Sequence, residues 1–244
     1  MREPKTQTKR NVRRKRRGEV LDAAVRVFHA QGYDATSIQD IADEVGILKG
    51  SIYYYITSKE DVLFEILDEV HRAAWGAVVE AMEMDGDALQ KIHAFVTTLA
   101  QFNAEHLERM GILLHDFRSL SETRRKEIVR ERDQYDRILR RLITQGQEEG
   151  VVCPDIDPKL AALAAMGMIN TIYQWYTPNG GFRAQYVGSF YADLFIRALA
   201  CNPEDHTSGH LAEHAPLPLS LDTLAAGPMP EWPAEGALPG SRPG

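Results

Sequence analysis

The sequence predicts an all-α protein of about nine helices, in which a small N-terminal three-helix unit precedes a larger helical domain. Apolar residues recur at three- and four-residue steps in successive segments between residues 17 and 199, which is the period of an α-helix. Two short helices meet at Gly46, a pattern typical of a helix-turn-helix. The last two helices carry more apolar surface than a monomer would leave exposed. We divide the chain into a basic disordered arm, a helix-turn-helix domain, a second helical domain and a disordered tail, at residues 1–17, 18–63, 64–201 and 202–244.

Length and composition are those of a folded protein. The 244 residues are 44% hydrophobic, which suffices for one large domain or two modest ones. No apolar run approaches the ~20 residues of a membrane span. The N-terminus also lacks the apolar centre of a signal peptide, so we expect a cytoplasmic protein with no membrane partner.

Charge is distributed unevenly along the chain. The net charge is −7, yet the first seventeen residues hold nine Lys or Arg against one Glu, a local charge of +8 that leaves −15 for the rest. The run KRNVRRKRR at residues 9–17 directly precedes the first predicted helix. Such a segment can neutralise DNA phosphates or lie in a minor groove, whereas the alternative is a solubilising leader. Because it adjoins a predicted helix-turn-helix, we favour DNA contact.

The first two helices form the scaffold of the N-terminal unit. Residues 17–31 form the first helix, which Gly32 closes. Thr36 followed three residues later by Gln39 predicts a capping box at the start of the second helix. Gly46 ends that helix, because glycine readily adopts the positive φ of a sharp turn.

The third helix, from Ile47 to about Tyr55, has an outer face suited to DNA. Ile52 and Ile56 can point into a small core, while small and polar residues face away from it. The alternative is a hairpin with an aromatic packing stripe, but three consecutive tyrosines cannot all face one core. Ser58 caps the next helix, where a lysine in the first turn would add a cation to phosphate-attracting amides. The predicted DNA-binding residues are Thr36, Ser37, Gln39, Leu48, Lys49, Gly50, Ser51, Tyr53, Tyr54 and Lys59.

These residues resemble the DNA-binding region of the TetR family of one-component bacterial repressors. Leu48 departs from the family pattern, which often has a capping Ser or Thr there, and Ile56 stands where a core Phe is usual. The resemblance implies an N-terminal helix-turn-helix DNA-binding domain and a C-terminal helical ligand-binding and dimerisation domain. The pattern T-x-x-x-I-A-x-x-A-G-V-S-x-G-x-L-Y-x-Y-F-x-S-K-E-x-L is represented here by Thr36, Ile41, Ala42, Gly46, Gly50, Tyr53, Tyr55, Ser58, Lys59 and Glu60.

The second domain begins with a long helix over residues 58 to about 83. Because this helix would start beside the DNA unit and end in the second domain, it can transmit a displacement between them. Further helices are predicted around 89–99 and 110–117 and over 121–149, before Gly150.

The last two helices predict a homodimer. Asp157 and Pro158 are an N-cap and first-turn pair that starts a helix running to about Tyr176. The final helix covers residues 182–199. Pairing with the same helices of a second chain would form a four-helix interface, and a two-fold dimer implies an inverted-repeat operator on double-stranded DNA. The predicted interface residues are Tyr186, Phe190, Tyr191 and Leu194.

A second resemblance concerns the effector. The segment WYTPNGGFRAQYVGSFYADLFIRAL, from Trp175 to Leu199, is similar to the C-terminal part of TetR-family repressors of fatty-acid and steroid-ring degradation. The run from Gly46 to Ser51 is also similar to members of that group. The resemblance implies a repressor that acyl-CoA thioesters release from DNA.

Helix geometry suggests residues for an apolar effector cavity, although core packing is the alternative role for each of them. CoA phosphates would also need cations at the cavity mouth, for which Arg118, Arg124, Arg125 and Arg183 are the candidates. The predicted ligand-binding residues are Phe95, Phe102, Met110, Leu114, Phe117, Met168 and Trp175.

Three other functional classes compete with this interpretation. An enzyme is disfavoured, since no Ser/His/Asp set, paired carboxylate motif, Gly-rich phosphate loop or metal cluster appears outside the tail, and we expect no cofactor. An architectural DNA binder would not need some 140 residues of helical domain after the DNA unit. The runner-up is a TetR-type repressor that senses lipophilic drugs and controls efflux, whose pocket would not need arginines at its mouth.

Cysteines and histidines give no firm metal site. Cys153 and Cys201 are predicted to be free thiols, because two cysteines far apart in sequence do not indicate a disulfide framework. Neither has the spacing of a zinc site. The tail holds eight of the twelve prolines, which predicts disorder. Its His206, His210 and His214 would align on a helix, but the nearby Gly and Pro weaken one, so we predict no metal.

Overall fold

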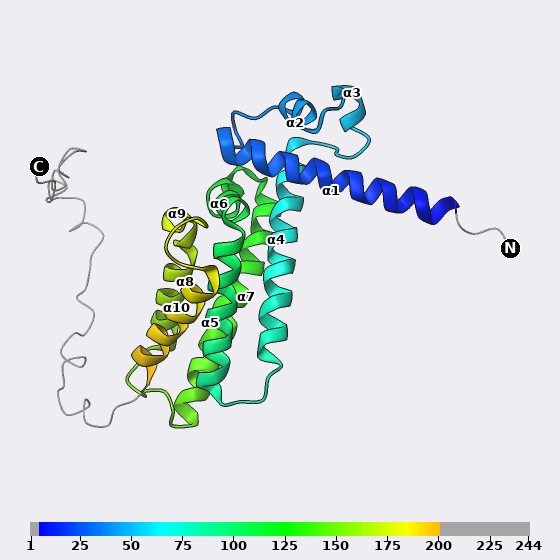
Figure 1. Ribbon diagram of the computed structural model, residues 1–244. Coiled ribbons are helices and arrows are strands. Elements are labelled where there is room, and N and C mark those ends of the chain that lie inside the picture. The colour runs from blue at the N-terminus through cyan, green and yellow to red at the C-terminus, as the bar shows by residue number, and fades with distance from the viewer. Residues whose placement is uncertain (1–4, 201–244) are drawn as a thin grey trace, which may run out of the picture. The chain divides into compact units, whose positions relative to one another are not determined.

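The computed structural model describes residues 5–200, with side-chain environments from residue 13 onward. In this range the chain is all-α, as predicted, apart from an isolated bridge between Val152 and Ala200 (Figure 1). The helices are α1 (Lys5–Gln31), α2 (Ile38–Val45), α3 (Lys49–Ile52), α4 (Lys59–Met82), α5 (Ala88–Glu105), α6 (Leu107–His115), the 3₁₀ helix η1 (Asp116–Ser119), α7 (Glu122–Glu148), α8 (Pro158–Asn170), α9 (Ile172–Trp175) and α10 (Ala184–Leu199).

The start of α1 corrects the predicted disordered arm. The helix begins at Lys5, so the basic run continues the first helix instead of forming an irregular segment. Lys and Arg are good helix formers, and neither Gly nor Pro interrupts residues 5–17. In Figure 1, this extension of α1 runs on past α3.

The cap of α2 lies one residue later than predicted. Ser37 accepts a hydrogen bond from Asp40 N, and the Asp40 side chain accepts one from Ser37 N, so these two residues form the capping box. The predicted box of Thr36 and Gln39 is therefore wrong. Gly46 ends α2 at φ 74°, as the turn requires.

Two predicted helices are shorter than expected. After Ile52 the backbone makes i→i+3 bonds, from Tyr54 N to Ser51 O and from Tyr55 N to Ile52 O, which tighten the end of α3 into turns. The helix predicted over 158–176 breaks at Thr171, whose hydroxyl donates to Met168 O and thus competes with the helical backbone bonds.

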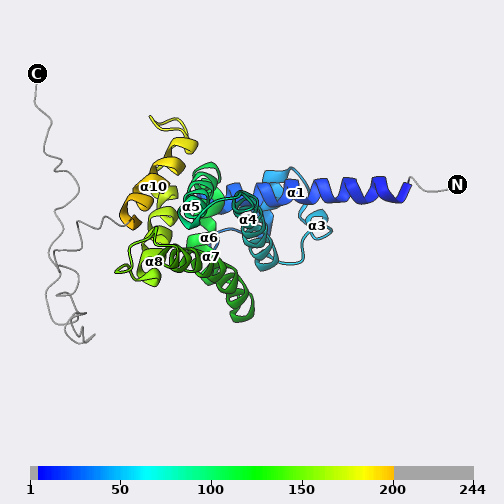
Figure 2. The same cartoon turned by 90° about the horizontal axis from the view of Figure 1, so that it is seen from below.

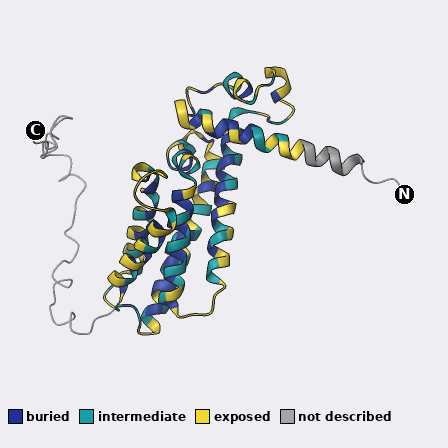
Figure 3. Ribbon diagram, in the orientation of Figure 1, coloured by how far each residue is buried: buried dark blue, intermediate teal, exposed yellow. Residues whose placement is uncertain are grey.

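The second domain is organised around α5, which packs against α4, α7, α8 and α10 (Figure 2). Its Ile92, Phe95 and Val96 are fully buried, and Figure 3 shows the buried residues concentrated where these helices face one another. Helix α10 approaches α5 closely at Gly188, where a Cβ atom would lie 2.7 Å from Thr97 O. A larger residue at this position would push the two helices apart.

Several predictions concern residues outside the described range. They are the disordered tail at 202–244, the thiol of Cys201 and the tail histidines. Across residues 5–200, every helix is too short or too polar to cross a membrane.

Candidate DNA-binding surface and effector cavity

The outer face of α3 is exposed as the sequence predicts. Ile52 is fully buried, whereas Lys49, Gly50 and Ser51 face outward and Leu48 is 81% exposed. Among the described residues, nothing lies within 4 Å of a Cβ built on Gly50, so a major-groove edge could approach the helix here. Direct contact by these residues, and by the exposed Tyr53 and Tyr54, stays a prediction.

Side chains at the start of α2 have different roles from those predicted. Thr36 is only 3% exposed and its hydroxyl donates to Gly32 O at 2.8 Å, so this side chain is buried away from any DNA. Gln39 donates to the Asp43 carboxylate at 2.6 Å, and the Ser37 hydroxyl caps the helix. Gln39 and Ser37 remain candidates for phosphate contact, since both are at least partly exposed.

The side chain of Lys59 binds backbone carbonyls of the α1–α2 connection instead of facing DNA. Its Nζ donates to Tyr33 O at 2.8 Å, Asp34 O at 3.2 Å and Thr36 O at 2.8 Å, and lies 4.3 Å from the Tyr33 ring centroid. An ammonium has three hydrogens, and all three are engaged. The predicted phosphate contact of Lys59 is therefore wrong in this conformation.

The basic extension of α1 contacts the turn that follows α3. The Arg13 guanidinium lies 4.9 Å from the Tyr54 ring centroid and donates a long hydrogen bond to Tyr54 O at 3.5 Å. Arg14 and Lys15 are exposed beside it. The extension thus places cations near α3, and their contact with DNA stays a prediction.

The first turn of α4 also binds the second domain. Arg124 of α7 pairs with Asp61 and lies 3.6 Å from Glu60, and Ser121 N donates to Glu60 Oε1 at 3.0 Å. The hydrogen bond from Arg124 lowers the pKa of Asp61, and the Ser121 backbone N–H lowers the pKa of Glu60. We call Lys59, Glu60 and Asp61 the junction, because they bind the α1–α2 connection on one side and the start of α7 on the other.

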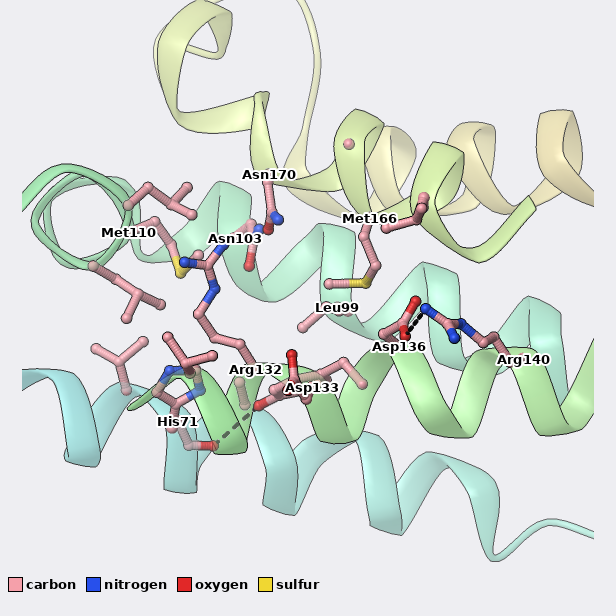
Figure 4. Close-up of a pocket in the computed structure, with 18 residues that line it drawn as sticks. His71, Leu99, Asn103, Met110, Arg132, Asp133, Asp136, Arg140, Met166 and Asn170 are labelled. Carbon is pink, nitrogen blue, oxygen red and sulfur yellow. Dashed lines mark hydrogen bonds and ion pairs between the residues drawn. The ribbon is translucent and has the colours of Figure 1, made fainter. Parts of the chain in front are cut away.

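A cavity of about 490 Å³ opens between α4, α5, α6, α7 and α8. Its volume lies within the ~300–1,000 Å³ range of small-molecule sites. Figure 4 shows Met110 of α6 and Met166 of α8 entering it, together with polar side chains from the other helices. The lining is Val70, His71, Ala74, Leu99, Asn103, Met110, Leu113, Leu114, Val129, Arg132, Asp133, Tyr135, Asp136, Arg140, Leu163, Met166, Gly167 and Asn170.

Two of the seven predicted ligand-binding residues, Met110 and Leu114, line this cavity. The other five do not line this cavity, so the prediction is wrong for them at this site. Phe95 packs near Tyr135 in the core, Phe102 stacks on His106, Phe117 lies beside two arginines, Met168 packs on the core, and Trp175 is 46% exposed near Tyr191. The predicted cations also lie elsewhere, since Arg118, Arg124, Arg125 and Arg183 do not line the cavity.

The polar groups of the cavity were not predicted from the sequence. Burial lowers the pKa of His71 to about 4 and lowers the pKa of Arg132 from its usual range. A signal for Arg132 was available, because it stands four residues after Ile128 and three before Tyr135, on the apolar stripe of α7. A cation on an apolar stripe is a candidate for a buried role.

The outer face of α8 and α10 carries exposed apolar side chains. The Phe182 and Tyr186 rings stack with centroids 5.7 Å apart, and the Tyr186 and Phe190 rings stack at 6.2 Å. Leu194 and Leu163 are half-exposed on the same two helices. Tyr191 is less exposed and packs near Trp175. These exposed residues agree with the predicted dimer surface, which stays a prediction.

Comparison with known proteins identifies two family regions. Residues 20–66 match a family described as bacterial regulatory proteins, tetR family, and residues 85–199 match a family described as tetracyclin repressor-like, C-terminal domain. The HTH-type transcriptional repressor KstR2 of Mycobacterium tuberculosis is 28% identical over 182 residues, which is 74% of this chain and 91% of KstR2.

Solved structures give the same result. The structure of the ketosteroid transcriptional regulator KstR2 superimposes with a TM-score of 0.72 at 27% identity, covering 77% of this chain and 96% of that one. The regulator PfmR from Thermus thermophilus gives 0.68 at 31% identity, covering 73% and 97%. AibR, in complex with isovaleryl coenzyme A and operator DNA, shares the fold with a TM-score of 0.67 at 24% identity, covering 76% and 98%.

Proposed function

This chain belongs to the TetR family of bacterial regulatory proteins, and from that premise we propose that its effector is an acyl-CoA thioester of fatty-acid or steroid catabolism. The protein is a DNA-binding transcriptional repressor, not an enzyme. In the proposal it acts in the cytoplasm as a homodimer on an inverted-repeat operator, and effector binding releases it.

The observation that carries the proposal is the composition of the cavity. Half of its lining is apolar, which suits an acyl chain or ring system, and the guanidinium of Arg132 stands among these groups. A half-buried guanidinium without an ion pair among the described residues disfavours a positively charged lipophilic drug, which is a common ligand class in the competing efflux hypothesis. The description of KstR2 as a ketosteroid regulator further supports a steroid- or lipid-derived effector.

The junction supports a route from cavity to DNA. Helix α4 contributes Val70, His71 and Ala74 to the cavity wall, and the same helix begins at the junction. We propose that the ligand displaces α4 and thereby changes the separation of the two recognition helices, which must meet half-sites about 34 Å apart. A near-complete switch requires ~10⁴-fold tighter binding to the released state, about 5.5 kcal/mol. Burial of about seven CH₂ groups, at ~0.8 kcal/mol each, would supply this difference if it occurred only in the released state.

Operator binding titrated with ligands tests the proposal. The operator is first isolated by selection from random duplexes, and release is followed by fluorescence anisotropy. CoA thioesters of fatty acids and steroid-ring acids are compared with their free acids and with cationic drugs. Release by the thioesters alone supports the proposal, whereas release by drugs or free acids alone contradicts it. If none of the ligands releases the operator, the sensor function itself is wrong.

A further inference from the structure

Arg132 lines the proposed effector cavity and forms no ion pair with any residue that the structure describes. It is half-buried, and its side chain extends from α7 towards Met110 and Asn103 (Figure 4). Within residues 5–200, no hydrogen bond or ion pair reaches its guanidinium, and its Cζ lies 5.1 Å from the centroid of the Phe117 ring. A guanidinium has five N–H donors, so this group has unused capacity to bind an acceptor.

Four residues that line the same cavity have a buried polar atom without a hydrogen-bond partner in the described part of the chain: His71, Asn103, Asp136 and Arg140. Asn103 is 2% exposed, and its amide donates to Ile169 O at 3.1 Å, which fixes the orientation of the side chain. Its Oδ1 accepts no hydrogen bond from any described residue. His71 is 5% exposed, and its Nε2 is likewise unpartnered among residues 5–200. Buried polar atoms without a hydrogen-bond partner are rare in folded proteins, so several of them in one cavity indicate a site that a ligand completes.

The other charged groups of the lining leave Arg132 available. Asp136 Oδ2 pairs with Arg140 Nη2 at 2.5 Å, whereas Asp136 Oδ1 and Arg140 Nε have no hydrogen-bond partner among the described residues. Asp133 follows Arg132 in the chain and raises its pKa, but burial has the larger, opposite effect. Asp133 is exposed, so water screens its charge.

We infer that the effector carries an oxygen acceptor, a carbonyl or a carboxylate, at the acyl end that occupies the cavity, and that Arg132 donates hydrogen bonds to it. Asn103 Oδ1 then accepts a hydrogen bond from a hydroxyl group or ordered water beside that oxygen, and His71 Nε2 accepts or donates one according to its tautomer. The inference depends on the proposed function only in taking this cavity as the effector site. An unsubstituted fatty acyl chain would leave Arg132 unpaired and would therefore be a poor effector.

Matched probes test this inference by calorimetry in the absence of DNA. The first set is octanoyl-CoA, 7-oxo-octanoyl-CoA and the mono-CoA thioester of octanedioic acid, which differ only near the end remote from the thioester. The second set repeats these acyl groups as methyl esters. The full-length chain is compared with Arg132→Met, with Arg132→Lys, and with Arg141→Met on α7, where the arginine is exposed and makes no ion pair within the described part of the chain.

We expect the parent to bind an oxygenated probe ~10- to 100-fold more tightly than the unsubstituted one, which is the range of a charge-assisted hydrogen bond. Arg132→Met should abolish this preference, Arg132→Lys should retain part of it for the carboxylate, and Arg141→Met should leave it unchanged. A stronger response to the oxo or to the carboxy probe identifies the acceptor as neutral or anionic.

The preference within a set tests Arg132, and the difference between the sets tests the CoA proposal. Preference among methyl esters with no binding of thioesters supports the role of Arg132 and contradicts the proposed function. Binding of every thioester without preference contradicts the role of Arg132 alone. A preference that survives in Arg132→Met, or the failure of all probes to bind, overturns the inference.

Discussion

Replacing Lys59 by Met separates a structural role from a DNA contact. The substitution keeps the length of the side chain but removes the ammonium that binds the carbonyls of Tyr33, Asp34 and Thr36. A hydrogen bond to a charged group contributes ~1.5–3 kcal/mol to stability. The bond to Asp34 O is long and exposed, and water can replace it. Two partly buried bonds remain, so we expect the free energy of unfolding to fall by about 3 kcal/mol.

The assay combines thermal unfolding with operator binding at several salt concentrations. A loss of about 3 kcal/mol corresponds to a fall in Tm of ~6–12 °C for a chain of this size. The slope of log K against log [salt] should not change, because no phosphate contact is lost. Lys49→Met is the matched control: this exposed lysine on α3 should weaken operator binding while Tm stays constant.

The opposite result would refute this reasoning. If Lys59 contacted phosphate, the salt slope would fall by about 0.9 for each contact, or ~1.8 for a dimer, with little change in Tm. A Lys59→Met protein that behaves like the Lys49→Met control therefore shows that Lys59 faces DNA.

Three further predictions concern packing, assembly and pH. Gly188→Ala should lower the free energy of unfolding by ~1–3 kcal/mol, because the added Cβ would press on the α5 backbone. The control, Gly76→Ala, adds a Cβ into open space and should not destabilise the protein. Equal Tm values for the two variants would contradict this packing. Phe190→Glu combined with Leu194→Glu should convert a dimer to monomers in sedimentation and abolish operator binding, so an unchanged dimer would move the interface elsewhere. Burial lowers the pKa of His71 to about 4 in the folded protein, against 6.5 when unfolded, so the unfolded state binds the proton first as the pH falls. The free energy of unfolding should therefore fall by ~3 kcal/mol between pH 6.5 and 4. Chemical denaturation should find that His71→Gln lacks this loss, and a parallel pH dependence of parent and variant would refute the buried neutral state.

Local sequence signals predicted most of the fold. Ser58, Asp157 and Gly46 each define an end of a helix through a bond or backbone conformation that depends on few neighbours. The capping box failed because Thr36 and Ser37 both have suitable side chains. Burial of Thr36 against Gly32, which is a tertiary effect, decides between them.

The cavity was harder to predict than the fold. Helical periodicity shows that Phe95 and Met110 both face inward, but it cannot show which of them meets another side chain and which meets a void. The role of Lys59 was missed for a similar reason. Its three acceptors are backbone carbonyls 23–26 residues away, and no side-chain pattern marks them in the sequence.

The junction has a consequence for protein engineering. A domain exchange that follows the boundary predicted from the sequence would cut the chain between residues 63 and 64, inside α4. The donor domain would then supply the residues at positions 60 and 61 in place of Glu60 and Asp61, whereas their partner Arg124 would still come from this chain. A donor domain without carboxylates at these two positions would leave Arg124 without its partners at the junction. The hybrid would then bind its operator, but ligand binding would no longer release it. A chimera that preserves induction should retain this chain's Glu60 and Asp61 and pair its Lys59 with the donor's α1–α2 connection.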